Sequence, residues 1–166
     1  MDLLILVTLG TQFEPFDRLL NEVQKLNTNE KIIVQAGHTK FKSDKMEIVD
    51  FIPYEKMNEL VNEARIIITH GGTGSIVEPL KKGKVIIGCA RLEKYGEHVD
   101  NHQTELISIF ADQGYILELK EGGDINTLLK EAENFVPKKY TSNTSIFMDK
   151  LQNKIDSYLS NKEKDI

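Results

Sequence analysis

The stretch IIITHGGTGSIVEPL, residues 66–80, runs an apolar strand into a glycine cluster and then into a helix. Glycines at such a turn let backbone N–H groups approach a ligand closely. The first turn of the following helix adds unpaired N–H groups and a partial positive charge, and Thr73 and Ser75 add hydroxyl donors. The stretch is therefore suited to bind phosphate. Its glycines are Gly71, Gly72 and Gly74.

This glycine pattern differs from the two best-known phosphate-binding loops. No G-K-[ST] follows it, and the full G-x-G-x-x-G spacing of a dinucleotide-binding turn is missing. A tight strand-to-helix turn without a ligand therefore stays open as an interpretation. Glu78 also has two interpretations. Ser75 and Glu78 have the spacing of a capping box, but a carboxylate one turn beyond a phosphate site could also accept hydrogen bonds from ribose hydroxyls.

A second polar stretch, RLEKYGEHVDNHQTEL, covers residues 91–106. A polar loop of this length in a compact domain is more often functional than not. Its Asn, Gln, His and Glu side chains supply the mixed donors and acceptors that sugar hydroxyls need. Two histidines four residues apart with Asp100 between them could hold a metal, but no HExxH pattern is present, and we expect no metal site. The polar residues are Arg91, Glu97, His98, Asp100, Asn101, His102 and Gln103.

The elements that position these residues alternate along the chain. Short apolar runs predict strands at 3–9, 31–37, 47–52, 65–70, 85–90 and 115–119. Apolar residues at helical spacing predict helices between them, including one over 54–64 and one that ends at Gly114. Near-continuous Ile, Val and Leu strands that alternate with helices indicate a parallel sheet covered on both faces. The predicted fold is α/β, a Rossmann-like doubly wound domain that binds ligands outside the carboxyl ends of its strands.

Turn and polar residues follow the other predicted strands as well. The first strand ends in GTQ, where Gly10 suits a sharp turn and Thr11 and Gln12 are polar. The second ends in QAGHT and the third in DFIPY, where the backbone of Phe51 and Ile52 could meet a flat base. Each signal is weak alone, since Gly and Pro after strands usually just make turns. Several such ends at one edge of the sheet are more suggestive.

Length and composition limit the remaining possibilities. The chain has 166 residues and a net charge of −5, so it offers no overall basic surface for nucleic acid. Its one cysteine, Cys89, rules out an internal disulfide and is expected to be a buried thiol. No apolar run approaches the ~20 residues of a membrane span, and the N-terminus lacks the features of a signal peptide. We expect a cytoplasmic protein.

The C-terminal segment reads differently from the rest of the chain. We divide the chain into a ligand-binding domain, residues 1–137, and a helical tail, residues 138–166. Apolar residues at helical spacing, Leu151 and Ile155 among them, predict an amphipathic helix in the tail. This helix either docks on its own domain or is offered to a partner protein.

Four motifs, in order, resemble the donor-binding C-terminal half of family 28 glycosyltransferases, the MurG-like enzymes of the GT-B fold. They are ILVTLGTQFEPFDRLL, DFIPYEKM, THGGTGSIVE and KYGEHVDNHQTEL. The resemblance covers residues 1–135 and is specific because four motifs agree in order and spacing. It extends in particular to the short, split members of the family, the Alg13-like proteins and the PssE/EpsF-type subunits of exopolysaccharide and capsule synthesis.

The resemblance implies a site for a UDP-sugar. Phe51 and Ile52 match positions that hold uracil through the backbone, with Met57 nearby. Glu78 matches the family's ribose carboxylate. The residues that match the turn beside the phosphates and the diphosphate-binding helix start are Gly10, Thr11, Gln12 and Gly72 to Ser75. The residues that match the stretch contacting the donor sugar are Asn101, His102 and Gln103, and Glu97 and His98 are typical of the bacterial split members.

The resemblance also implies a partner. This chain begins directly at the donor half, whereas a GT-B enzyme has an acceptor-binding half before it. In the split members that half is a separate, membrane-anchored Alg14-like protein, and the acceptor is a lipid-linked sugar. We therefore expect one subunit of a two-component transferase that needs its partner for activity and lies, through it, at the inner face of the cell membrane. The loop that carries Glu97 and His98 (the His/Glu loop) resembles that of the bacterial members, which favours exopolysaccharide or capsule synthesis over N-glycan synthesis.

The implied reaction is hexosyl transfer from a UDP-sugar with inversion at the anomeric carbon. Negative charge develops on the leaving UDP, and the chain has no D-x-D motif that would hold a metal against it. The helix start after Gly72 is the expected substitute, so we expect neither a metal nor another cofactor. A general base is also required. His98, His102 and Glu97 are candidates, and so is a residue of the missing half.

Two other classes of function compete with this interpretation. A non-catalytic UDP-sugar-binding subunit that stabilises its membrane-bound partner would use the same loops. A nicotinamide or flavin oxidoreductase fits the fold class only, because the dinucleotide glycine fingerprint and an acidic residue at the end of the second strand are both missing. The sugar, the acceptor, the linkage and the oligomeric state stay open.

Overall fold

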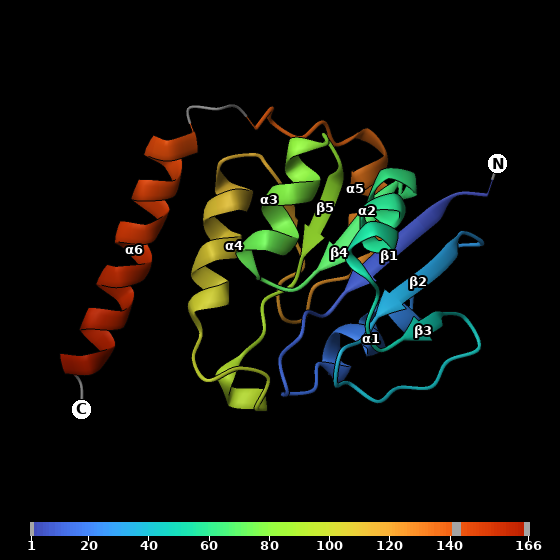
Figure 1. Ribbon diagram of the computed structural model, residues 1–166, viewed down its shortest axis with the longest axis horizontal. Coiled ribbons are helices and arrows are strands. Elements are labelled where there is room, and N and C mark those ends of the chain that lie inside the picture. The colour runs from blue at the N-terminus through green and yellow to red at the C-terminus, as the bar shows by residue number, and fades with distance from the viewer. Residues whose placement is uncertain (1, 141–143, 165–166) are drawn as a thin grey trace.

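The computed structural model describes residues 2–140 and 144–164, and its centre is a parallel sheet of six strands (Figure 1). The strand order is β3-β2-β1-β4-β5-β6. The strands are β1 (Leu4–Thr8), β2 (Lys31–Gln35), β3 (Glu47–Val49), β4 (Ile66–Thr69), β5 (Val85–Gly88) and β6 (Leu117–Glu118). This order is that of a doubly wound fold, in which the order of successive strands reverses between β1 and β4. The predicted α/β Rossmann-like fold is confirmed.

Helices cover both faces of the sheet (Figure 1). They are α1 (Asp17–Gln24), α2 (Tyr54–Glu63), α3 (Thr73–Lys81), α4 (His102–Asp112), α5 (Ile125–Asn134) and α6 (Thr144–Lys164), with a 3₁₀ turn, η1, at Glu93–Tyr95. The core residues of α1 and α5 share one apolar cluster, and those of α2, α3 and α4 share the other. The sheet therefore separates two cores.

The central strands are apolar along most of their length because both faces of the sheet are buried. In β1, Ile5 and Val7 belong to the cluster under α1 and α5, while Leu4 and Leu6 belong to the cluster under α2, α3 and α4. Side chains alternate between the two faces along a strand, so a strand between two helical layers needs an uninterrupted apolar run.

The observed elements differ from the predicted ones mainly at their ends. The second strand ends at Gln35 rather than at residue 37, because Gly37 turns the chain with a positive φ of 58°. Helix α5 was not predicted at all. Its signal is Asp124, whose side chain caps the helix start by accepting from the Asn126 N–H, and Leu129 and Ala132 form its buried side.

The C-terminal helix docks on its own domain, which was one of the two predicted interpretations. Helix α6 packs against α4 (Figure 1). Leu151 is buried in the apolar cluster that includes α4, and Ile155 packs against the edge of that cluster. In the described part of the chain, no helix combines the length and apolarity of a membrane span.

Replacing Leu151 tests how much this docking stabilises the domain. We expect Leu151→Ala to lower the free energy of unfolding by about 2–3 kcal/mol, because a buried side chain is removed from the α4–α6 contact. Lys150→Ala, on the exposed side of the same helix, should change it by less than about 0.5 kcal/mol. Urea denaturation measures both. Equal values for the two variants would show that the docking of α6 adds nothing to the stability of the domain.

Candidate functional site

A cavity of about 300 Å³ opens at the carboxyl edge of the sheet, where β1, β2, the loop before α2 and helix α3 meet. It brings together residues that lie far apart in the sequence. The predicted binding residues that line it are Gly10, Thr11, Phe51, Ile52, Met57, Gly74, Ser75 and Glu78. The predicted binding residues outside its lining are Gln12, Gly71, Gly72, Thr73, Asn101, His102 and Gln103.

Sequence reasoning missed part of the lining, of which Thr8 and Gln35 are the most informative members. Gln35 is buried at the end of β2. Its Nε2 donates to the carbonyls of Gly10 and Asp50 at 2.9 and 3.1 Å, and its Oε1 accepts from the Gly10 N–H at 3.2 Å. It therefore ties the ends of β1, β2 and β3 together and holds the Gly10 turn. A polar residue that closes the apolar run KIIVQ was the available signal.

Two glycines of the site, Gly10 and Gly72, make room for the imidazole of His70. A Cβ on Gly10 would lie 2.6 Å from His70 Nε2, and one on Gly72 would lie 2.5 Å from His70 Cε1. A Cβ on Gly71 would lie 2.6 Å from the Cβ of Gln103. Only Gly74 of the cluster has nothing within 4 Å of such an atom. Gly71 and Gly72 therefore make room for buried side chains, and an opening of the backbone toward a ligand stays a prediction for Gly74.

His70 is the buried centre of this arrangement. Its Nδ1 lies 3.3 Å from Gln103 Nε2 and its Nε2 lies 3.2 Å from Ser75 Oγ. Burial, with the positive charge of Arg91 nearby, lowers the pKa of His70 to about 4. The ring is therefore neutral at neutral pH. His70 was not among the predicted site residues, although a histidine directly after an apolar strand was visible in the sequence.

The start of α3 is free to meet an anion. Gly72 is the N-cap residue and has no side chain to cap the helix. The first N–H groups of a helix lack partners within it and carry partial positive charge. The capping-box interpretation of Ser75 and Glu78 is wrong, because Ser75 lies at the third helical residue. Glu78 instead lines the cavity with 63% of its side chain exposed and meets Lys81 at 3.4 Å.

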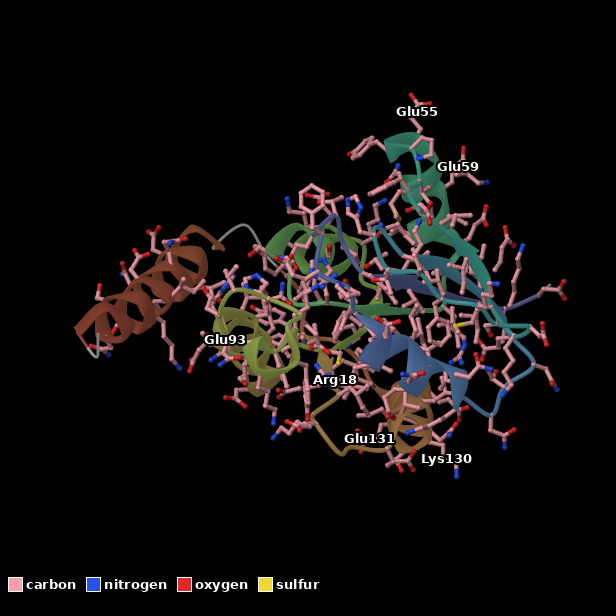
Figure 2. The ribbon with its side chains drawn as sticks, turned by 90° about the horizontal axis from the view of Figure 1, so that it is seen from below. Arg18, Glu55, Glu59, Glu93, Lys130 and Glu131 are labelled. Atoms are coloured by element: carbon pink, nitrogen blue, oxygen red, sulfur yellow. The ribbon has the colours of Figure 1, made fainter. Side chains whose placement is uncertain are left out.

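Glu97, a predicted candidate for the general base, is fully engaged in the protein. Its carboxylate accepts from Arg18 Nε and an Arg18 terminal nitrogen, both at 2.9 Å, and from the Leu92 N–H at 2.9 Å. Figure 2 shows Arg18 within the body of the molecule, whereas Glu55 and Glu59 of α2 point away from it. Because Glu97 is buried and paired, it holds the loop before α4 in place and is not available as a base.

Arg91 fastens the same loop to the end of β1. It is completely buried and donates to the carbonyls of Glu14 at 2.8 Å, Glu97 at 3.0 Å and Leu9 at 2.5 Å. Its guanidinium also lies over the ring of Phe16. Arg91 therefore holds the loop after β5 against the loop after β1.

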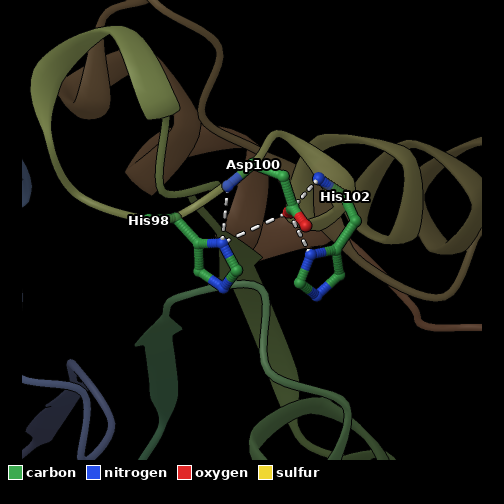
Figure 3. A group of neighbouring side chains, drawn as sticks. All are labelled: His98, Asp100 and His102. Carbon is green, nitrogen blue, oxygen red and sulfur yellow. Dashed lines mark hydrogen bonds and ion pairs between the residues drawn. The ribbon is translucent and has the colours of Figure 1, made fainter. Parts of the chain in front are cut away.

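His98, Asp100 and His102 form a cluster at the start of α4 (Figure 3). Asp100 Oδ1 accepts from the His102 N–H at 3.0 Å and is in hydrogen-bond contact with His102 Nδ1. His98 Nδ1 accepts from the Asp100 N–H at 3.2 Å. Burial raises the pKa of Asp100, but the hydrogen bonds from His102 outweigh it and the net pKa is lowered. Burial, with His102 beside it, lowers the pKa of His98.

This cluster could in principle hold a metal, since its ligand atoms lie within 4.8 Å of one another. Hydrogen bonds inside the cluster already occupy Asp100 Oδ1 and the Nδ1 atoms of both histidines. The arrangement is therefore explained without an ion, and the absence of a metal stays a prediction. The same bonds leave His102 Nε2 without a role inside the cluster.

Gln103 and Cys89, two further residues considered in the sequence, are both buried. Gln103, expected to contact the donor sugar, is only 2% exposed, and its side-chain amide is hydrogen-bonded to protein groups. It therefore lies behind the cavity. Cys89 is a buried free thiol, as predicted, and burial raises its pKa to about 12.

Most of the chain is similar in sequence to known glycosyltransferases. The glycosyltransferase family 28 C-terminal domain matches residues 4–156. The UDP-N-acetylglucosamine transferase subunit ALG13 of Candida albicans is 28% identical over 119 residues, which are 72% of this chain and 36% of that protein. The subunit of the same name from Saccharomyces cerevisiae is 30% identical over 73 residues, 43% of this chain and 34% of that protein. The chain thus spans about a third of the length of these curated relatives.

Solved structures share the fold at lower identity. An NMR solution structure of ALG13 has a TM-score of 0.57 and 20% identity, and the match covers 90% of this chain and 95% of that one. The crystal structure of CalG4, the calicheamicin glycosyltransferase, has a TM-score of 0.58 and 17% identity, with 94% of this chain and 38% of that one covered. At these identities the likeness is one of fold.

The buried neutral His70 predicts how stability changes with pH. Its pKa is about 4 in the folded state against 6.5 for the free side chain, so between these values the unfolded chain binds a proton that the folded chain does not. The contribution is complete above about pH 6.5 and falls by roughly 3 kcal/mol as the pH drops to about 4.

Urea denaturation across this pH range checks the prediction. His70→Asn should show a shallower loss of stability toward acid than the wild type, while carboxylates that titrate in the same range affect both proteins alike. Parallel curves for the two proteins would contradict a depressed pKa at His70.

Proposed function

Because the chain belongs to the family of the glycosyltransferase family 28 C-terminal domain, we propose that it is the UDP-sugar-binding catalytic subunit of a two-component inverting glycosyltransferase. One observation carries this proposal. Residues from three separate loops, each matching a motif of the donor site, line a single cavity beside the uncapped start of α3.

The donor is proposed to lie across this cavity. The diphosphate would meet the first N–H groups of α3 at Gly74 and Ser75, because the helix start offers donors and partial positive charge. Glu78, one turn further along the same helix, would accept hydrogen bonds from the ribose hydroxyls. The uracil would meet the backbone of Phe51 and Ile52 on the opposite wall.

The helix start also accounts for leaving-group stabilisation in this proposal. As the bond to the sugar breaks, negative charge grows on the diphosphate, and fixed N–H dipoles at that position stabilise the transition state without reorganising. No metal is required for this step, so we propose a metal-independent transfer. Inversion follows from direct displacement at the anomeric carbon.

His102 is the general base that the geometry supports best. Glu97 is held by Arg18, and the His98 side chain is only 6% exposed, which keeps it from an acceptor hydroxyl. His102 has its Nδ1 on the Asp100 carboxylate instead, which leaves the Nε2 lone pair free to take a proton. Its side chain is 30% exposed at the carboxyl edge. We propose that it deprotonates the acceptor hydroxyl.

The finer assignments are also proposals. The curated relatives are UDP-N-acetylglucosamine transferase subunits, which supports a UDP-sugar donor and makes UDP-N-acetylglucosamine the first to test. A lipid-linked sugar is the proposed acceptor, and a membrane-anchored Alg14-like protein is the proposed partner. The partner would hold the chain at the cytoplasmic face of the membrane. The sequence of the His/Glu loop supports exopolysaccharide or capsule synthesis.

Calorimetric titration of the whole chain tests the donor site. UDP and UDP-sugars should bind without added metal and NAD should not, because the cavity has a helix start for the diphosphate but no dinucleotide fingerprint. The ranking of UDP-N-acetylglucosamine, UDP-glucose and UDP-galactose would identify the sugar. Binding of NAD alone would contradict the proposal.

Glu78→Ala sharpens this test. The variant should bind UDP about tenfold more weakly, because hydrogen bonds to a charged group are lost. Its stability should change by less than about 0.5 kcal/mol, because Glu78 makes only an exposed pair with Lys81. Glu59→Ala is the matched control, since Glu59 forms the same kind of exposed pair with Lys56 on α2, and neither residue lines the cavity. Equal UDP affinity in the two variants would contradict a ribose contact.

His102→Gln tests the proposed base in the complex with the partner. We expect kcat to fall by about 100-fold or more, with UDP affinity within about twofold of the wild type, because only proton transfer is lost. Asp100→Asn should lower kcat less, since it disturbs the orientation of His102 and not its presence. Unchanged turnover in His102→Gln would place the base on the partner. A wild-type complex that binds UDP but transfers nothing would indicate a non-catalytic, stabilising subunit.

A further inference from the structure

The side-chain amide of Gln103 is held in one orientation by two backbone donors. Its Oε1 accepts from the Gly71 N–H at 2.9 Å and from the Arg91 N–H at 3.1 Å. Both bonds are buried. The reversed amide would place an NH₂ group against two N–H donors, which leaves all of them unpaired away from water. The amide nitrogen of Gln103 must therefore point the other way, toward His70.

This orientation determines where His70 carries its proton. Gln103 Nε2 lies 3.3 Å from His70 Nδ1 and can only donate, so Nδ1 must be the unprotonated, accepting nitrogen. A neutral imidazole then carries its hydrogen on Nε2, which lies 3.2 Å from Ser75 Oγ. The two glycines that pack on the ring, Gly10 and Gly72, keep it from rotating into another arrangement.

The tautomer of His70 in turn determines what Ser75 can do. The Ser75 oxygen accepts from His70 Nε2, so the Ser75 hydroxyl hydrogen is left to donate elsewhere. Ser75 lines the cavity at the uncapped start of α3, next to the open side of Gly74. Because this hydrogen is not used on His70, the hydroxyl can donate to a ligand that enters the cavity, and an anion is the best acceptor there.

We propose that Gln103 is a positioning residue that locks His70 as the Nε2–H tautomer and thereby makes Ser75 a hydrogen-bond donor to a phosphate oxygen of the nucleotide. The identity of that ligand rests on the proposed function. The chain of contacts runs from the backbone N–H groups of Gly71 and Arg91 through two buried side chains to the cavity. Gln103 thus acts on the diphosphate end of the donor from behind the cavity wall, and it does not contact the sugar.

Gln103→Glu tests the lock with almost no change of shape. A carboxylate still accepts from Gly71 and Arg91, but its second oxygen cannot donate to His70. His70 should then carry its proton on Nδ1, with Nε2 accepting from Ser75. Nitrogen-15 NMR of the imidazole at about pH 8 distinguishes these tautomers. We expect an Nε2–H ring in the wild type and an Nδ1–H ring in the variant. A wild-type ring protonated on Nδ1, or a variant ring that keeps its proton on Nε2, would overturn the inference.

The consequence for binding is tested by a double-mutant cycle with UDP. Gln103→Glu and Ser75→Ala should each weaken UDP binding about tenfold, since each removes the same donor to a charged oxygen. Together they should weaken it little more than either alone, because Gln103 acts through Ser75. A simple repulsion between the new carboxylate and the phosphate would persist in the Ser75→Ala background, so additive losses would overturn the inference.

Gln113→Glu is the matched control, because it makes the same chemical change at an exposed position just after α4. It should leave both UDP affinity and the His70 spectrum unchanged. Failure of the wild type to bind UDP would overturn the proposed function and the ligand named here, while the tautomer would still be measured. Normal UDP binding by the wild type and by Gln103→Glu would overturn this inference alone.

Discussion

The packing of one neutral imidazole between two glycines is the constraint on which the cavity depends. His70 follows β4 and fills the space that side chains on Gly10 and Gly72 would occupy, so the turns after β1 and β4 can approach each other only around it. Gln103 holds one edge of the ring and Ser75 meets the other. Because the strand order reverses between the neighbouring strands β1 and β4, this contact lies where doubly wound folds bind their ligands.

A second buried network places the polar loop before α4 against this centre. Arg91 joins that loop to the end of β1, and Glu97 joins it to α1 through Arg18. Buried charges cost much free energy unless partners compensate them. Glu97 is paired with Arg18, and the Arg91 guanidinium donates to three backbone carbonyls, although its Nε has no partner. The free-energy cost of burying these charges is explained if the loop must be rigid. A rigid loop keeps Gln103 behind the cavity wall and presents His102 at the edge.

The site therefore has two layers with different chemistry. The outer layer, with Gly74, Ser75 and Glu78, offers donors, a helix start and a carboxylate to the solvent-filled cavity. The inner layer consists of buried polar side chains that satisfy one another and so fix which groups of the outer layer donate and which accept. The motifs contribute residues to both layers, so a motif residue such as Gln103 can shape the cavity without lining it.

The sequence by itself determined the fold class and the binding edge, because uninterrupted apolar strands between helices permit little other than a covered parallel sheet, and such a sheet collects its loops at one edge. It also predicted Ser75, Glu78 and Phe51 as binding residues, and all three line the same cavity. Only the tertiary structure decided what Gly72, Glu97 and Gln103 do, because their partners lie on other strands and helices. Spacing along one segment indicates local periodicity. Whether a polar side chain is hydrogen-bonded to a neighbour or available to a ligand depends on contacts between distant segments, which only the fold brings together.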